Sequence, residues 1–179
     1  MLHGNATGGL RWEFRQGLSI LRDGDTRLLD MRHNKRGIAR VVSGTERWLV
    51  YHQGFWRPRL VLARNGRSIV VIDDYCPGNI SRVEVPGGRT YALQVKHNPT
   101  VRVSLLSANG NEVLHYSQTP AKPKPRATFH VSDRSIPNED LLVLAVLGCH
   151  AFLSFREELS TASVKPKRLT VAAEHDSIE

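Results

Sequence analysis

The sequence is poor in the residues that stabilise secreted domains. Its 179 residues include only two cysteines, Cys76 and Cys149, and two thiols in a chain of this size are typical of a reducing compartment. The N-terminal segment lacks a cationic region followed by an apolar core, so we expect no secretory signal peptide. These features predict a cytoplasmic protein.

The sequence also lacks the short motifs that most often carry catalysis or bind cofactors. The HExxH, GxSxG, Walker, GxGxxG and paired CxxC motifs are all absent. The eight histidines are dispersed along the chain, and none pairs with a cysteine or an acidic residue at the spacing of a metal site. We therefore predict a protein that is not an enzyme and that uses neither a metal nor another cofactor.

Acidic residues are scarce in the first part of the chain. Residues 1–72 contain 13 of the 25 Lys and Arg but only 5 of the 17 Asp and Glu, so this region carries the whole formal net charge of +8. Arg outnumbers Lys by 19 to 6 in the whole chain, and the forked guanidinium suits paired contacts with phosphate. This balance favours an anionic partner, such as a phospholipid surface, a nucleic acid or an acidic protein.

Helix-length patterns are missing from most of the chain, where turn signals separate short runs of strand composition. Asn65-Gly66, Asn109-Gly110 and Pro86-Gly87-Gly88 are such turns. We predict about twelve strands, at residues 10–14, 18–22, 26–31, 38–43, 47–52, 59–64, 68–73, 80–85, 90–95, 100–106, 111–116 and 127–131. Hairpin after hairpin favours an antiparallel sandwich or barrel over a parallel fold with crossover helices.

One long apolar run follows the predicted strands. Residues 141–155, LLVLAVLGCHAFLSF, carry no charge, and Asn138, Glu139 and Asp140 before them are typical of a helix start. We predict a helix over 139–158, which is buried because it is apolar on every side. Fifteen residues span roughly 22 Å, less than a bilayer core of about 30 Å, so a membrane span is the second interpretation. His150 would lie in the core, where a histidine is usually neutral and hydrogen-bonded.

A barrel of about twelve strands would give this helix a place. Eight strands already fill their own interior, whereas a wider barrel leaves a hole that a helix about 10–12 Å across would fill. Gly148 and Ala145 would let the barrel wall approach the helix closely. The sequence therefore predicts one all-β domain over 10–158, a closed antiparallel barrel of about twelve strands around the C-terminal helix. We expect residues 1–9 and 159–179 to be flexible ends.

This plan resembles the tubby-like superfamily, in which many short antiparallel strands precede a C-terminal apolar helix. The helix region is most similar to the phospholipid scramblase and LURP-one-related branch. The resemblance covers about residues 10–158 and is carried by Pro137, Glu139, Asp140, the Gly148-Cys149 step and Phe152-Leu153-Ser154-Phe155. It implies non-enzymatic binding of anionic phospholipid, phosphoinositide headgroups included. The chain lacks the longer Asp-rich segment that scramblases have before this helix, so we expect no calcium site.

Two basic clusters in the first half are the candidate binding residues. They comprise Arg32, Lys35, Arg36, Arg40, Arg57, Arg59, Arg64 and Arg67. Trp48, Tyr51, Phe55 and Trp56 lie among them, and mixed aromatic and basic side chains are typical of contacts with a membrane interface. We predict a peripheral membrane protein, without a transmembrane span, that binds anionic lipid through a basic barrel face. Single-stranded nucleic-acid binding and a protein-interaction scaffold are the alternative functions. The simplest explanation of any single basic residue is an arginine on the solvent-exposed face of a barrel strand, without a ligand.

Overall fold

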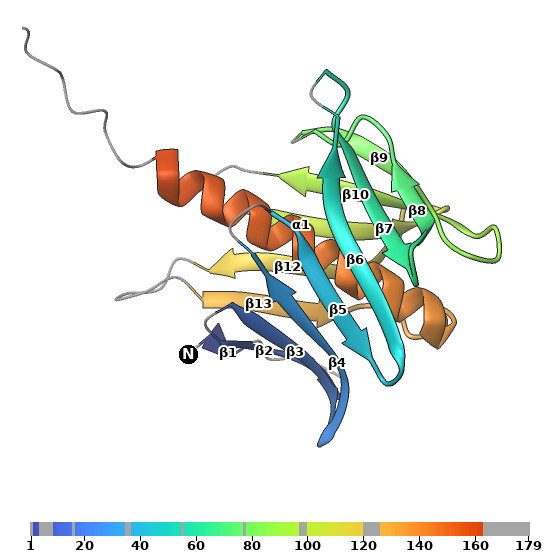
Figure 1. Cartoon of the computed structure of the whole chain (residues 1–179), viewed down its shortest axis with the longest axis vertical. Helices are drawn as coiled ribbons and strands as arrows, with labels where there is room; N and C mark the ends of the chain where they lie inside the picture. Colours follow the sequence, from blue (N-terminus) through green and yellow to red (C-terminus); the bar gives the residue numbers. More distant parts are fainter. Residues whose placement is uncertain are drawn as a thin grey trace, which may run out of the picture.

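The computed structural model describes residues 2–3, 9–15, 17–34, 37–54, 56–76, 78–96, 100–119 and 126–162. Within this part the chain forms thirteen β-strands followed by one α-helix (Figure 1). The strands are β1 (Leu2–His3), β2 (Leu10–Arg15), β3 (Leu18–Asp23), β4 (Thr26–His33), β5 (Ala39–Ser43), β6 (Glu46–Gln53), β7 (Arg59–Arg64), β8 (Arg67–Ile72), β9 (Ile80–Glu84), β10 (Thr90–Lys96), β11 (Arg102–Ser107), β12 (Glu112–Thr119) and β13 (Arg126–Val131). The helix is α1 (Asn138–Ala162).

Within each sheet, consecutive strands pair as antiparallel hairpins, which confirms the predicted meander. Strands β1 to β8 form one sheet in sequence order, and β9 to β13 form a second sheet in the same way. All twelve predicted strands are present as β2 to β13, and β1 adds a short partner to β2. Along most strands buried and exposed residues alternate, as in β2 and β10, because successive side chains point to opposite faces.

The prediction of a closed barrel is wrong, because the strands form two separate sheets. Within the described residues no ladder of hydrogen bonds joins β8 to β9 or β13 to the β1–β2 edge, although both pairs of edges lie close together. The connection from β8 to β9 is a wide turn whose amides bond elsewhere. Tyr75 N–H donates to Pro58 O at 2.9 Å, and Gly78 N–H donates to Val95 O at 3.0 Å. The chain therefore leaves the first sheet instead of continuing it.

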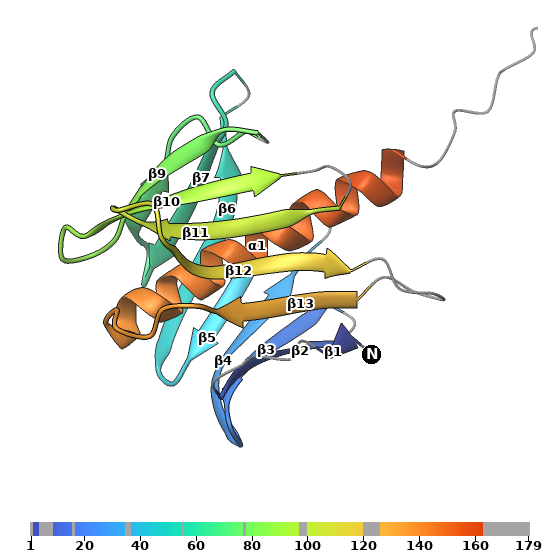
Figure 2. The same ribbon diagram turned by 180° about the vertical axis from the view of Figure 1, so that it is seen from behind.

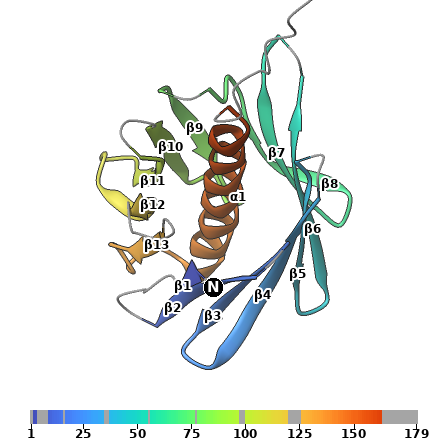
Figure 3. The same ribbon diagram turned by 90° about the vertical axis from the view of Figure 1, so that its left-hand side faces the viewer.

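Helix α1 lies between the two sheets and forms the centre of the core (Figures 2 and 3). Residues 143–152 are all buried. The 18-residue window Asn138–Phe155 is long and apolar enough to cross a membrane, with a mean hydropathy of 1.3, but 72% of it is buried inside the protein. The apolar run therefore faces protein. The helix begins as predicted and continues four residues beyond 158, while residues 163–179 lie outside the described part.

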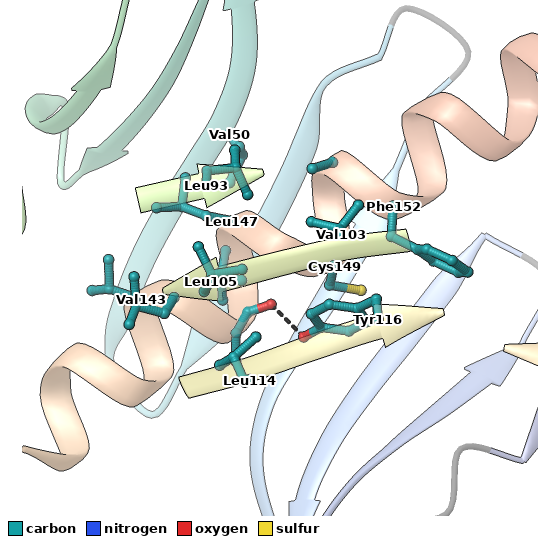
Figure 4. Packing of buried hydrophobic residues seen from close by; sticks show 14 of the residues in the cluster. Val50, Leu93, Val103, Leu105, Leu114, Tyr116, Val143, Leu147, Cys149 and Phe152 are labelled. Carbon is teal, nitrogen blue, oxygen red and sulfur yellow. Dashed lines mark hydrogen bonds between the residues drawn. The ribbon is translucent and has the colours of Figure 1, made fainter. Parts of the chain in front are cut away.

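Close approach of the second sheet to the helix depends on Gly148, as predicted. A Cβ added at this position would lie 2.6 Å from Tyr116 Cε2 and 2.9 Å from Leu105 Cδ2. Tyr116 is fixed in place by two hydrogen bonds of its hydroxyl. The hydroxyl accepts from Trp12 Nε1 at 2.7 Å and donates to Ala145 O at 2.7 Å, the bond drawn in Figure 4. These two bonds connect both sheets to the helix backbone.

A buried carboxylate fixes the start of the helix. Asp140 is 1% exposed and accepts two hydrogen bonds from the guanidinium of Arg89, at 2.5 and 2.8 Å, and one from Tyr91 Oη at 2.7 Å. The hydrogen bonds from Arg89 hold the pKa of Asp140 below its usual range. From the sequence, we expected Asp140 only to interact favourably with the positive end of the helix dipole. In the structure this side chain connects the first turn of α1 to β10 and to the turn that precedes β10.

Candidate functional site

One end of the eight-stranded sheet carries four of the eight candidate binding residues. Because neighbouring strands run in opposite directions, β4 and β6 both finish at the same end of the sheet. The β4–β5 and β6–β7 connections lie at this end. The register places Arg32 opposite Arg40, and Gln53 opposite Arg59. We call this region the basic end. It is defined by Arg32, Arg40, Trp56, Arg57 and Arg59.

The structure separates the four arginines of the second predicted basic cluster, residues 57–67, into two pairs. Arg57 and Arg59 lie at the basic end, whereas Arg64 and Arg67 lie at the opposite end of β7 and β8. There Arg64 binds Glu46 at 3.6 Å and Glu139 of the helix at 3.1 Å, which is a structural role. Lys35 and Arg36 are outside the described residues.

The arginines of the basic end are mostly available to a ligand. Arg32, Arg40 and Arg57 are exposed, and within the described part of the chain none of them forms an ion pair. Arg59 binds Asp73 with a distance of 2.6 Å between Nε and Oδ1. By contrast, Arg11, Arg15 and Arg22 share Glu13, and Arg27 binds Asp30. Apart from Arg59, the basic end therefore offers cationic groups that no described side chain neutralises.

The β6–β7 hairpin projects beyond the neighbouring strands (Figure 1). It presents an aromatic side chain to solvent at this end. Trp56 is 91% exposed. Together with Gln53, Gly54, Arg57 and Arg59 it lines an open depression with a volume of about 420 Å³. Gly54 closes the hairpin with a φ of +86°, and a Cβ there would lie 2.5 Å from Arg57 O. Only glycine fits this position.

The other aromatic residues of the predicted cluster do not join Trp56. Trp48 is buried and its Nε1 donates to Glu46 at 3.0 Å, Tyr51 is half-buried, and Phe55 lies outside the described residues. Beside Arg40, the outer face of the sheet exposes Val42 and Leu49, and Leu49 is the register partner of Arg40. The surface next to the basic end is thus both cationic and apolar.

Directly behind the basic end, three histidines form a hydrogen-bonded chain. His150 of α1 is 0% exposed. Its Nδ1 lies 3.2 Å from Nε2 of His33, at the end of β4, and its Nε2 lies 3.2 Å from Nε2 of His52, in β6. The ring of His52 also lies 5.3 Å from that of Tyr75, and Tyr75 lies 5.5 Å from Phe155. We call the three hydrogen-bonded residues His33, His150 and His52 the histidine chain.

Burial keeps the histidine chain neutral. Desolvation lowers the pKa of His33 to about 4 and also lowers the pKa of His52 and His150. The positive charge that His33 or His52 would carry opposes protonation of His150 further. His52 as a whole is exposed, yet its ring edge packs against His150 and Tyr75, which explains the direction of its shift.

The geometry of the chain does not match a metal site. His150 faces its two partners with opposite ring nitrogens, so the three rings do not converge on one point, and no cluster of metal-ligating side chains occurs among the described residues. The sequence predicted a buried, hydrogen-bonded His150, as observed. It gave no signal for His33 and His52, which are 117 and 98 residues away from His150 and meet it only through the fold.

Comparison with protein-family models, curated proteins and solved structures found no match for this chain. The basic end and the histidine chain must therefore be interpreted from their own chemistry.

Proposed function

We propose that this protein binds the anionic surface of a cytoplasmic membrane peripherally, through the basic end of its eight-stranded sheet. The observation that carries the proposal is Trp56, 91% exposed at a hairpin tip and directly before the exposed Arg57. A tryptophan with an apolar ring and a polar N–H prefers the headgroup level of a bilayer. Arginines around it would bind headgroup phosphates with forked hydrogen bonds.

The arrangement of the site supports a surface contact rather than a deep pocket. The depression beside Trp56 is open, and Arg32, Arg40 and Arg57 are spread over neighbouring hairpins of one sheet. Each basic residue near an anionic membrane contributes about 1 kcal/mol, and salt screens this attraction. The exposed Val42 and Leu49 add apolar area next to these charges. The resemblance to scramblase and LURP-one-related proteins remains a prediction that points to the same ligand class.

The alternatives from the sequence have less support in this geometry. Single-stranded nucleic acids need successive aromatic platforms for stacking, and the described part of the basic end offers Trp56 while Trp48 is buried. A protein partner would meet the same surface, and would compete with vesicles for it.

Vesicle binding of the whole protein tests the proposal. We expect binding at low salt to vesicles of phosphatidylcholine that contain phosphatidylglycerol or a phosphoinositide, weak binding to phosphatidylcholine alone, and release as salt rises. Trp56→Ala or Arg57→Ala should reduce the affinity about five- to tenfold, since each removes roughly 1 kcal/mol of interfacial or electrostatic attraction.

Arg67→Ala is the matched control, because Arg67 is an exposed arginine of the same sheet at the opposite end. Tryptophan fluorescence gives a second measurement: Trp12 and Trp48 are buried, so a blue shift on binding reports Trp56. Equal binding to neutral and anionic vesicles, or equal losses in Arg57→Ala and Arg67→Ala, would exclude the basic end as the lipid site. Preferential binding of single-stranded oligonucleotides would favour the nucleic-acid alternative.

A further inference from the structure

The histidine chain can accept one proton without losing a hydrogen bond. It contains two N···N contacts of 3.2 Å, each of which needs one hydrogen atom. With all rings neutral, both contacts are satisfied if one outer ring donates and the other accepts. With one added proton, His150 becomes an imidazolium that donates to both outer rings. A second proton would force two N–H groups to face each other, so the chain has capacity for a single charge.

Among the side chains that the structure describes, this charge has no counter-ion in the free protein. The ring of Tyr75 contacts His52 and is itself covered by Phe155, and His33, His52 and His150 are the titratable groups that face one another. Asp30, three residues before His33, binds Arg27, and Asp73, which follows β8, binds Arg59. Among the side chains that the structure describes, no carboxylate influences the pKa of any of the three rings. Protonation is therefore uncompensated until an anion arrives.

The basic end is where that anion would bind. His52 is exposed and directly precedes Gln53, which lines the depression beside Trp56. Tyr75 connects the two features, because its ring lies 5.3 Å from that of His52 and its N–H donates to Pro58 O in the β6–β7 connection. A phosphate held by Arg57 would place negative charge at the end of β6 that also carries His52, the solvent-facing member of the chain.

We propose that the basic end takes up one proton together with its anionic lipid, and that the His33–His150–His52 chain is the acceptor of this proton. This inference rests on the proposed function and adds a regulation to it: the protein binds anionic membranes more tightly as the pH falls. The negative surface potential of an anionic membrane supports the uptake, because it raises the local proton concentration roughly threefold. His52 admits the proton, and His150 holds it between two neutral acceptors.

The test measures binding of the whole protein to phosphatidylglycerol-containing vesicles between about pH 7 and pH 5, the range in which histidine titrates. Phosphatidylglycerol is a phosphodiester whose charge is constant over this range, so a change in affinity comes from the protein. We expect the affinity to rise as the pH falls, by up to tenfold per pH unit for uptake of one proton. Mixing protein and vesicles in weak buffer near pH 6 should consume up to one proton per bound molecule.

His52→Gln should bind as well as the natural protein at pH 7 but should lose the rise at acid pH and the proton uptake. This change is at a solvent-exposed position, whereas His150→Gln alters the centre of the core and serves only as a second variant if it folds. His130→Gln is the matched control. His130 lies on the five-stranded sheet beside His115, with ring centroids 5.4 Å apart, and its removal changes the histidine count equally.

The outcomes separate the two proposals. Binding that is independent of pH overturns the proton uptake and leaves membrane binding intact. An equal loss of pH dependence in His130→Gln also overturns it, since total charge would then be the cause. Absence of binding at every pH overturns the proposed function itself. Loss of the pH dependence in His52→Gln alone, with proton uptake in the natural protein, supports the histidine chain as the acceptor.

Discussion

Gly148 is the residue at which the helix and the second sheet come closest. A Cβ at this position would overlap Tyr116 and Leu105, and Tyr116 cannot move aside without breaking its hydrogen bonds to Trp12 and Ala145. We expect Gly148→Ala to lower the free energy of unfolding by about 1 to 2 kcal/mol, because overpacking costs more than the gain in helix propensity of about 1 kcal/mol.

Urea denaturation measures this difference, and Ser154→Ala on the same helix is the control because Ser154 is only half-buried. A Gly148→Ala protein that is as stable as the natural one would show that the sheet yields at Tyr116. The sequence pointed to this glycine correctly, since a small residue within an otherwise bulky apolar helix indicates close packing. It could not show that the partner is a hydrogen-bonded tyrosine 32 residues earlier, because that contact depends on the register of β12.

At the scale of the element, the start of α1 depends on the ion pair between Asp140 and Arg89. We expect Asp140→Asn to destabilise the protein by about 1 to 3 kcal/mol at neutral pH, because it removes a charged acceptor from Arg89 and Tyr91 in a buried position. Arg89 is half exposed, so water can partly replace the lost partner, which keeps the effect below that of a fully buried pair.

The same variant has a defined pH dependence. The pKa of Asp140 in the folded protein is lowered from 3.8, so its stabilisation is present above about pH 4 and is lost as the pH falls through the folded value. When the pH is lowered through this acid range, the free energy of unfolding of Asp140→Asn should therefore fall less than that of the natural protein. Chemical denaturation measures both. Glu139→Gln is the control: its partner Arg64 lies in a surface ion pair, for which about 0.5 kcal/mol or less is expected. Equal effects of both variants would contradict a special role for Asp140.

Elements were easier to predict than their assembly. Asn-Gly turns and alternating residues locate β2 to β13, because both depend on local backbone and side-chain geometry. The separation into two sheets could not be predicted in this way, because it depends on long-range hydrogen bonds. In the connection after β8, backbone amides donate to Pro58 and Val95 instead of extending the first sheet. The basic end was found in part: charge marked Arg57 and Arg59, but nothing local distinguished them from Arg64, which binds the helix.

For the whole molecule, the histidine chain predicts a loss of stability in mild acid. Burial lowers the pKa of His33 from 6.5 to about 4, so below about pH 6.5 the unfolded chain binds protons that the folded chain excludes. The free energy of unfolding should therefore fall as the pH decreases from about 6.5 to 4, by about 3 kcal/mol for His33 alone. Above pH 6.5 this effect is absent.

Urea midpoints between about pH 7 and pH 4.5 measure this dependence. His33→Gln should flatten the curve, and His130→Gln on the five-stranded sheet should change it much less. A flat curve in the natural protein would mean that the chain accepts its first proton freely even without a bound anion. Acid would then leave the stability of the fold unaffected between these two pH values.

The position of α1 after all thirteen strands sets the order in which the protein can be completed during synthesis. The inner faces of both sheets are covered by an element of 25 residues that is translated after every strand it contacts. At 5–20 residues per second, making this helix takes roughly 1 to 5 s. During that time apolar strand surfaces are exposed on the nascent chain, so we expect early segments to need protection from aggregation or the assistance of a chaperone until the helix arrives.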